Sequence, residues 1–151
     1  MTPPAPPATA RDATIAALTR VLADGERATV ALDRALGAVA PGAERALATG
    51  LVYGTLRWLP ALDAALAPHL RDAEALPLRV RLALRVGAYE RAVRGTPPHA
   101  AVHAWVDLVK RSRGPERALA GLVNAVLRRV DLADPRVTAD PAAAVALPPA
   151  L

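Results

Sequence analysis

Prolines recur in this sequence at intervals that suit short helices. Proline fixes its own φ angle and lacks an N–H group, so it is accepted in the first turn of a helix but not in its interior. Pro60, Pro77, Pro98 and Pro115 each stand at the start of an apolar run with helical periodicity. Because no segment shows the alternation of a strand, we expect an all-α fold. The predicted helices span residues 11–24, 29–39, 43–58, 60–68, 77–94, 98–112 and 115–130.

The run 77–94 carries two apolar stripes on opposite sides of the predicted helix. Leu82 and Val86 belong to one stripe, and Leu84 and Gly87 belong to the other. Burial on two sides is typical of the central helix of a bundle. We therefore expect the other helices to pack around this one.

Two glycines, Gly50 and Gly54, lie one turn apart in the run 43–58. Glycine costs a helix about 1 kcal/mol relative to alanine. The pair therefore predicts the close approach of a neighbouring helix. Because no glycine cluster follows a predicted strand, a loop that binds nucleotide phosphates is not expected.

The run 115–130 has one apolar face and one polar face. Leu122 and Val126 recur on the apolar face, whereas Arg117, Asn124 and Arg128 fall within about 40° of one another on the opposite side of an ideal helix. This helix is expected to bury one side and to leave the other free for a partner.

Positive charge is concentrated in two segments. Residues 76–94 hold five arginines against one glutamate, and residues 110–129 hold six basic residues against one glutamate. A concentrated basic surface is typical of proteins that bind a polyanion, because binding releases counterions from phosphates. A GC-rich coding sequence would also give this excess of arginine, since Lys110 is the only lysine. Charge alone leaves both explanations open.

The remaining composition excludes several classes of protein. The 151 residues suit one globular domain, and the absence of cysteine excludes disulfides, thiolate metal sites and a cysteine nucleophile within them. No secretory leader and no apolar stretch of about 18 residues occurs. We expect a soluble, cytoplasmic protein that does not enter a membrane.

Catalytic and metal-binding patterns are weak. His99 and His103 have the spacing of a two-histidine metal pair, but Ala100 stands where a zinc-protease helix carries its acidic residue. The alternative places His99 in the first turn of its helix and His103 on a solvated flank. Ser112 has no nearby base to activate it. We expect no metal, no cofactor and no catalytic residue in this chain.

Four segments carry a resemblance to a known family. LVYGTLRW at 51–58, LALRVGAYE at 82–90, PPHAAVHAWVDLVKR at 97–111 and GLVNAVLRR at 121–129 resemble, in order and spacing, the NusB-like domain that opens the RsmB (Sun) family of ribosomal RNA cytosine-5 methyltransferases. The similarity extends over about residues 11–148. It implies an all-α bundle of about seven helices in two packed sub-bundles, and a role in binding RNA.

The resemblance also implies that RNA binding and catalysis belong to different domains. Residues 1–10 would be a flexible leader, residues 11–130 the RNA-binding domain and residues 131–151 a linker towards a catalytic domain that this chain lacks. That domain would bind S-adenosylmethionine and methylate 16S ribosomal RNA through a cysteine. The expected partners are RNA, with ribosomal RNA favoured, and the catalytic domain of the same protein; DNA is not expected.

Candidate site residues come from the motifs and from the charge pattern. The family motifs contain Arg57, Arg85, Tyr89 and Asn124, each of which has either a structural role or an RNA contact. Arginine suits phosphate because its planar group donates two parallel hydrogen bonds. Because the four aromatic residues all fit a core stripe or its edge, phosphate contacts are expected to supply most of the affinity. The predicted RNA contacts are Arg11, Lys110, Arg111, Arg113, Arg117 and Arg128.

Two other functions remain open at the level of sequence. A free-standing NusB-type factor for transcription antitermination would share the later motifs. A protein-docking helical domain with little intrinsic affinity for RNA would share the fold and the arginine content. The coding sequence beyond Leu151 and a titration with RNA separate these alternatives.

Overall fold

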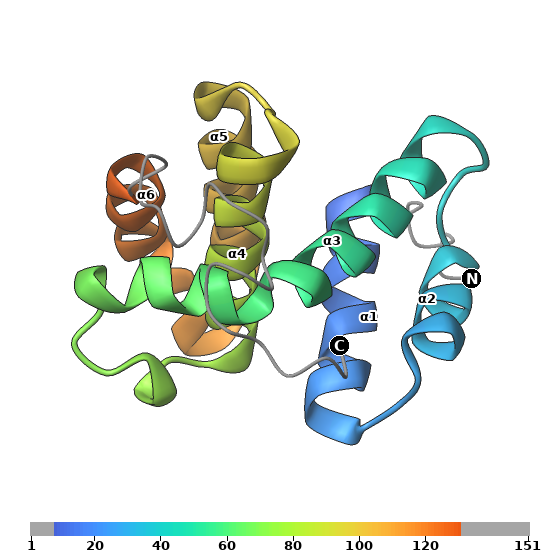
Figure 1. Cartoon of the computed structure of the whole chain (residues 1–151), viewed down its shortest axis with the longest axis horizontal. Coiled ribbons are helices and arrows are strands. Elements are labelled where there is room, and N and C mark those ends of the chain that lie inside the picture. The colour runs from blue at the N-terminus through green and yellow to red at the C-terminus, as the bar shows by residue number, and fades with distance from the viewer. Residues whose placement is uncertain (1–7, 131–151) are drawn as a thin grey trace, which may run out of the picture. The chain divides into compact units, whose positions relative to one another are not determined.

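The computed structural model describes residues 8–130 of the 151-residue chain. Within that range the secondary structure consists of six α-helices and four short 3₁₀ or π segments, without a strand (Figure 1). The prediction of an all-α fold is confirmed. Only the last three residues of the predicted leader are described, and the predicted linker, residues 131–151, lies outside the described residues. None of the described helices is long and apolar enough to cross a membrane.

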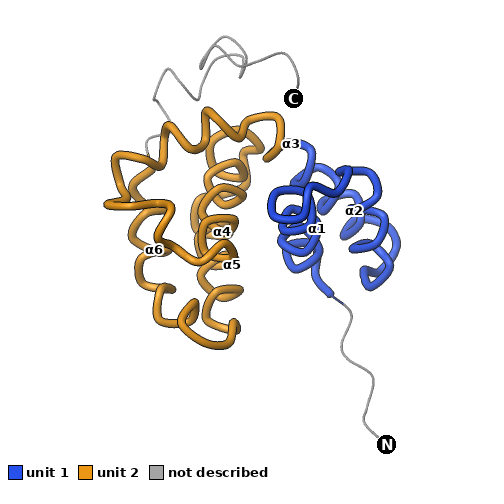
Figure 2. Tube along the Cα trace, turned by 90° about the horizontal axis from the view of Figure 1, so that it is seen from below, with its two compact units in different colours: residues 1–53 blue, residues 54–151 orange. Residues whose placement is uncertain are grey.

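The helices form two compact units, residues 1–53 and residues 54–151 (Figure 2). The helix α3 (Ala43–Leu66) begins in the first unit and ends in the second. The resemblance implied two packed sub-bundles, and this division agrees with it.

In the N-terminal unit, α1 (Ala10–Asp24) packs against α2 (Ala28–Leu36). Oγ1 of Thr9 accepts a hydrogen bond from the N–H of Asp12 at 3.1 Å, and the Asp12 carboxylate accepts one from the N–H of Thr9 at 3.2 Å. This capping box satisfies N–H groups that have no partner inside the helix. The helix ends at Gly25, whose φ of 71° is a left-handed conformation that suits glycine.

Two hydrogen bonds tie α3 to the rest of the N-terminal unit. The Glu44 carboxylate accepts one from the N–H of Ala10 at 2.8 Å, and Nε of Arg45 donates one to the carbonyl of Val39 at 2.9 Å. The buried side chains of this unit are small or aliphatic and include Ala13, Ile15, Ala17, Leu18, Ala31, Leu32, Ala35, Ala48 and Leu51. Polar contacts at helix ends therefore supplement a core of modest side-chain volume.

The C-terminal unit contains the rest of α3 and three further α-helices. In chain order its elements are η1 (Ala67–His69), η2 (Ala73–Ala75), α4 (Leu78–Tyr89), the π-helical η3 (Glu90–Arg94), α5 (Pro98–Lys110), the 3₁₀ segment η4 (Gly114–Leu119) and α6 (Ala120–Arg129). α4 contacts α5 and α6, which also contact each other. The three helices thus form the framework of this unit.

The central position predicted for the run 77–94 is confirmed for α4. Leu82 and Leu84, one from each predicted stripe, are fully buried. A Cβ added at Gly87 would lie 2.7 Å from the side chain of Leu127 in α6 and 3.2 Å from that of Trp105 in α5. Since real Cβ atoms essentially never come closer than 3.0 Å to such neighbours, Gly87 is what lets the three helices meet.

Gly54 in α3 allows the close approach that the glycine pair predicted. A Cβ at this position would lie 2.1 Å from the ring and hydroxyl of Tyr89 at the end of α4. The aromatic ring therefore fills the space that any larger residue at position 54 would need. Close packing of this kind fixes how α3 and α4 cross inside the C-terminal unit.

The helix boundary predicted at Pro60 is wrong, because α3 continues through it instead of separating 43–58 from 60–68. A proline inside a helix removes one backbone hydrogen bond and costs about 3 kcal/mol. Leu62 and Leu66, which follow it, are buried. Burial of one leucine side chain contributes about 1.5–3 kcal/mol, so tertiary packing here outweighs the local preference.

The run 115–130 also differs from the prediction of one continuous helix. Its first turns are the 3₁₀ segment η4, which begins at Gly114 with a φ of 74° and contains Pro115 in its first turn. A 3₁₀ helix has 3.0 residues per turn instead of 3.6. The predicted alignment of Arg117 with Asn124 and Arg128 on one α-helical face therefore does not hold.

Candidate nucleic-acid interface

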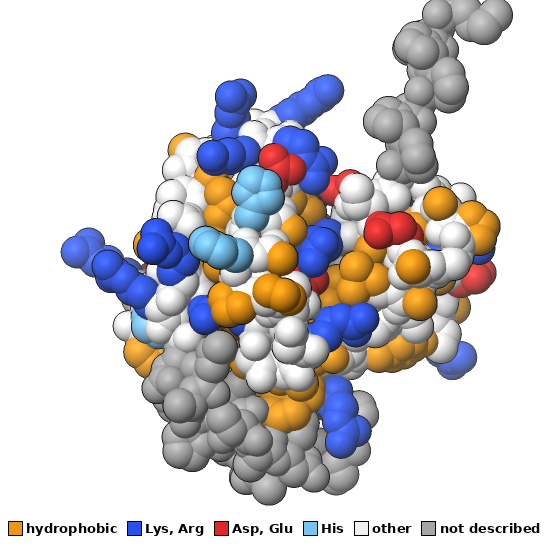
Figure 3. Space-filling view, turned by 90° about the horizontal axis from the view of Figure 1, so that it is seen from above, with side chains coloured by type: hydrophobic (Ala, Val, Ile, Leu, Met, Phe, Trp, Pro, Cys, Tyr) orange, Lys and Arg blue, Asp and Glu red, His pale blue; other side chains and the backbone are white. Residues whose placement is uncertain are grey.

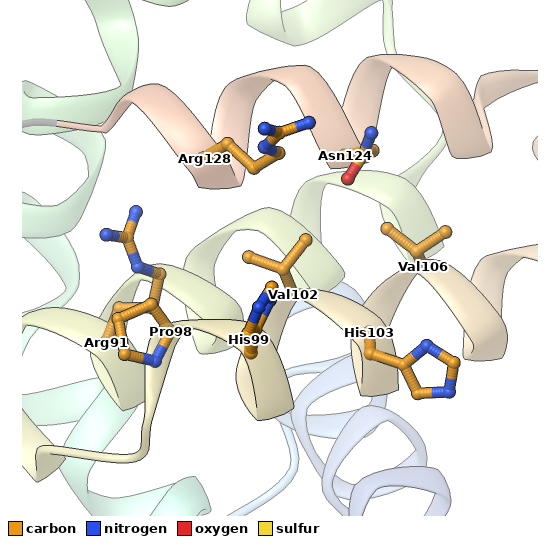
Figure 4. Close-up of a pocket in the computed structure, with 8 residues that line it drawn as sticks. All are labelled: Arg91, Pro98, His99, Val102, His103, Val106, Asn124 and Arg128. Carbon is orange, nitrogen blue, oxygen red and sulfur yellow. The ribbon is translucent and has the colours of Figure 1, made fainter.

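A groove of about 470 Å³ lies between α5 and α6 in the C-terminal unit (Figure 4). One wall comes from α5 and the other from α6, with one residue supplied by η3. The lining residues are Arg91, Pro98, His99, Val102, His103, Val106, Asn124 and Arg128. Its volume falls within the roughly 300–1,000 Å³ of pockets that bind small molecules.

The groove combines an apolar floor with nitrogen-rich side chains. Val102 and Val106 supply the apolar surface, while two arginines, two histidines and one asparagine supply hydrogen-bonding groups. None of the lining residues that the structure describes is acidic. On the face shown in Figure 3, Lys and Arg side chains lie near the histidines, and an acidic side chain lies beside one of them. Such a surface favours an anionic ligand that also has an apolar part.

Arg91 connects η3 to α6, which forms one wall of the groove. Its Nη1 donates a hydrogen bond to the backbone carbonyl of Leu127. Leu127 lies in the last turn of α6, where carbonyl groups have no partner inside the helix. Arg91 thus links η3 to the end of α6, and its guanidinium is itself held in place.

The guanidinium of Arg91 is only partly compensated by this contact. Its Nε is buried and makes no hydrogen bond among the described residues. Burial lowers the pKa of Arg91, because removal from water disfavours the charged form. Arginine nevertheless stays protonated in proteins, so an anion in the groove would relieve this cost.

His99 and His103 both line the groove and are exposed. Pro98 is the first residue of α5, which places His99 in the first turn and His103 one turn later on the same side. Within the described residues no third histidine or carboxylate joins them in a group that could hold a metal ion. His99 in the first turn and His103 on an exposed flank agree with the positions predicted for them, and the groove that they share was not predicted.

The connector between α5 and α6 carries four of the predicted contacts, Lys110, Arg111, Arg113 and Arg117, and all four are exposed. Arg111 pairs with Asp107 at 3.0 Å. The other three make no ion pair within the described part of the chain.

Ser112 anchors the middle of this connector. Its hydroxyl accepts a hydrogen bond from Nε of Arg79 at 2.7 Å and donates one to the carbonyl of Leu108 at 3.1 Å. Arg79 belongs to α4, so the connector is attached to the central helix of the unit. The charged residues on either side of Ser112 are therefore presented by a defined backbone.

The structure distributes the predicted contacts over three places. The four connector residues lie at the start of the α6 region, whereas Arg128 lies near the end of α6 and lines the groove. Arg117 belongs to η4 and is not among the groove residues. Arg11 lies in α1, which belongs to the other compact unit, and its side chain is half-buried.

The four motif residues divide between structural contacts and exposed positions. Nε of Arg85 bonds the carboxylate of Asp63 at 2.8 Å, which joins α4 to α3. Tyr89 packs over Gly54, as described above. Arg57 is exposed on α3, and Asn124 lines the groove beside Arg128. Two motif residues therefore have a visible packing role, and one lies where a ligand could reach it.

A second, smaller cavity of about 240 Å³ adjoins the Arg85–Asp63 pair. Its lining includes the carboxylates of Asp63 and Glu74 next to Arg81 and Arg85. Carboxylates repel phosphate, so this cavity suits a polyanion less well than the groove between α5 and α6.

Sequence reasoning did not assign three of the groove residues, Arg91, His99 and His103, to an RNA-binding site. The histidines were noticed for their spacing, and that same spacing placed them on one face of a helix. Arg91 gave no local signal, because its partner Leu127 is 36 residues away in the chain. Val102 and Val106 are four residues apart, as His99 and His103 are. This spacing could have indicated that all four residues lie on one side of the helix.

Comparison with known proteins places the chain in a recognised group. Residues 8–131 match the NusB family. The chain is 54% identical over 107 residues to ribosomal RNA small subunit methyltransferase B of Thermus thermophilus, a match that covers 70% of this chain and 26% of that protein. It is 35% identical over 118 residues to the protein of the same name from Xanthomonas campestris, covering 74% of this chain and 25% of the relative. The chain thus spans about a quarter of the length of these relatives.

Two solved structures have a similar fold. A chain in the crystal structure of a plectonemic RNA supercoil superposes with a TM-score of 0.73 at 25% identity, covering 80% of this chain and 90% of that one. A chain in the crystal structure of antitermination factors NusB and NusE in complex with dsRNA gives a TM-score of 0.72 at 25% identity, covering 80% and 92%.

Proposed function

Since this chain belongs to the NusB family, we propose that it is an RNA-binding module of a 16S ribosomal RNA (cytosine-C5) methyltransferase. The observation that carries the proposal is the groove between α5 and α6, which presents two arginines, two histidines and an asparagine without an acidic neighbour among its described lining residues. The sequence similarity to the small-subunit methyltransferases points to ribosomal RNA as the polyanion.

The basic connector strengthens the electrostatic part of this proposal. Lys110, Arg113 and Arg117 are exposed and unpaired within the described residues, so they can exchange bound counterions for phosphates. The groove and the connector both lie in the C-terminal unit. RNA that contacts both the groove and the connector would bind along α6.

The catalytic step belongs to another part of the protein in this proposal. The relatives are about four times as long as the matched segment, which leaves room for a separate methyltransferase domain. We propose that this module positions ribosomal RNA in the cytoplasm for that domain, which would supply the S-adenosylmethionine site and the nucleophilic cysteine. The module and its catalytic domain would then be partners within one protein.

Residues 8–130 do not present the features that hold S-adenosylmethionine. No strand occurs in residues 8–130, so that range lacks the glycine-rich turn between a strand and a helix that holds nucleotide cofactors. The chain also has no cysteine to act as a nucleophile. No catalytic step is therefore assigned to these residues.

Two neighbouring arginines provide a matched test of the groove. Arg128 lines it, whereas Arg129 is exposed on the same turn and is not among the lining residues. Arg128→Ala is expected to weaken binding of a single-stranded ribosomal RNA fragment about tenfold, because it removes a charged hydrogen-bond donor. Arg129→Ala should stay within about twofold of the unchanged protein. Fluorescence anisotropy at about 50 mM salt, repeated at higher salt, measures both.

The same titration decides between the proposal and its alternatives. If the unchanged protein binds no RNA at about 50 mM salt, the module is a protein-docking domain instead. Equal losses for Arg128→Ala and Arg129→Ala would move the site away from the groove. Free-standing antitermination is favoured by the fold similarity to NusB, and it would be supported by a stop codon directly after Leu151 in the gene.

A further inference from the structure

The two ends of the α5–α6 groove differ in chemistry. Arg91 lies near the start of α5 and Arg128 near the end of α6 (Figure 4). Asn124 lies about one turn from Arg128 on α6, and Val106 lies about two turns after Pro98 on α5. Val102 lies on the floor between the two ends. One end is therefore cationic, and the other combines an apolar surface with a neutral amide.

The cationic end suits a phosphate group. Arg91 is held in place by the Leu127 carbonyl, and its buried Nε has no hydrogen bond among the described residues. Arg128 is exposed and free to adjust towards the ligand. One fixed guanidinium and one movable guanidinium can surround a phosphate from two sides.

The other end suits a flat nucleobase. The valines at 102 and 106 offer apolar surface against which a base can lie. The amide of Asn124 offers both donors and an acceptor, so it can pair with the polar edge of a base, as asparagine does with adenine. His103 at the rim offers a ring that can stack on a base. A ligand that was only an anion would use none of these groups.

The distance between the two ends matches a single nucleotide. Arg128 and Asn124 lie four residues apart on α6, which corresponds to about 6 Å along the helix axis. The phosphate and the base of one nucleotide span a comparable length. In duplex RNA the bases face one another inside the helix and the major groove is too narrow for side chains, so only an unpaired base can enter this groove.

We propose that the α5–α6 groove binds one unpaired nucleotide of single-stranded RNA, with its phosphate between Arg91 and Arg128 and its base against Val102, Val106 and Asn124. The inference rests on the proposed RNA-binding function and adds that the groove distinguishes bases. The basic connector would supply affinity without regard to sequence, and Asn124 would supply selectivity.

Asn124→Ala tests the base contact without changing charge. Oligo(A), oligo(C) and oligo(U) of about ten nucleotides, and a duplex of equal length, are titrated against both proteins at several salt concentrations. The unchanged protein should prefer one of the three oligomers. The variant should bind that oligomer about tenfold more weakly and lose the preference. Its affinity for the duplex and the slope of affinity against salt should be unchanged, because no phosphate contact has been removed.

A second variant keeps the site testable if Asn124→Ala does not fold. His103 is exposed, so His103→Ala leaves the core intact, and it should also weaken the preferred oligomer more than the duplex. Circular dichroism confirms that both variants are folded. Equal affinities of the unchanged protein for all three oligomers, or equal losses on oligomer and duplex, would overturn the nucleotide site while leaving RNA binding in place. Failure of the unchanged protein to bind any RNA would overturn the proposed function itself.

Discussion

Residues 8–53 carry five basic and five acidic side chains, whereas residues 54–130 carry thirteen basic and six acidic ones, a net charge of +7. The two units also differ in how their helices are joined. The N-terminal unit uses polar contacts at helix ends, such as the capping box at Thr9. The C-terminal unit also has polar contacts, such as the bond from Arg91 to the Leu127 carbonyl, and adds close packing at glycines, where Gly54 and Gly87 receive neighbouring side chains. Charge and tight packing therefore coincide in the unit that contains the groove, which gives its cationic residues a rigid support.

The largest loss of stability is expected from adding a side chain at Gly54. Gly54→Ala places a Cβ about 2.1 Å from the Tyr89 ring, so the ring must move, and we expect the free energy of unfolding to fall by about 3 kcal/mol. Chemical denaturation measures the change. The control is Gly121→Ala in α6, where nothing lies within 4 Å, and which should be neutral or slightly stabilising. Equal effects of the two substitutions would show that the contact between Gly54 and Tyr89 is not closely packed.

A paired removal of charge tests the difference between the units in binding. Arg113→Gln with Arg117→Gln should weaken single-stranded RNA binding about tenfold and reduce the slope of affinity against salt by about 1.4, at most about two. The matched pair in the N-terminal unit, Arg27→Gln with Arg34→Gln, should leave both quantities unchanged. A loss of affinity in the second pair would extend the RNA-binding surface to the neutral unit. No change in the first pair would remove the connector from the site.

Loss of the capping box should affect the N-terminal unit. Thr9→Ala removes the acceptor for the N–H of Asp12, and we expect a loss of about 1 kcal/mol in unfolding free energy. Thr9→Ser keeps a hydroxyl and should retain most of the stability. Hydrogen exchange of α1 amides locates the change, and protection lost equally in α4 would contradict its assignment to one unit.

The smallest effect is expected from releasing an arginine from its surface partner. Asp107→Asn removes the carboxylate that pairs with Arg111 and with it one negative charge near the connector, so RNA affinity should rise about twofold. Glu26→Gln does the same for Arg34 in the N-terminal unit and should not change RNA affinity. Anisotropy titration compares both variants with the unchanged protein. A rise for both would mean that net charge alone, and not its location, controls binding.

Helix positions were predictable where local rules agreed with packing. Pro98 begins α5 and the two stripes of the run 77–94 are buried, as their residue types require. Pro60 was misjudged because the buried leucines after it stabilise α3 from outside the local sequence. The alignment of Arg117 with α6 was misjudged because Gly114 and Pro115 start a 3₁₀ turn, which changes the angle per residue.

The site was only partly predictable from sequence. Arg128 and Asn124 were singled out by a helical face and by a motif, and both line the groove. The spacing of His99 and His103 predicted that they share one side of a helix, but the sequence does not show which helix packs beside them. Arg91 depends on a carbonyl contributed by a distant helix, and no local pattern encodes a contact of that range. The predicted contact at Arg11 remains a prediction.

The bond from Arg91 to the Leu127 carbonyl has an evolutionary consequence. A residue that both completes a helix end and touches the ligand cannot be exchanged to alter recognition without also weakening the scaffold. His99 and His103, being exposed and without such a structural duty, are open to replacement. Homologous proteins that prefer other RNA sequences should therefore keep arginine at the position of Arg91 and diverge at lining positions without such a structural contact, those of His99, His103 and Asn124.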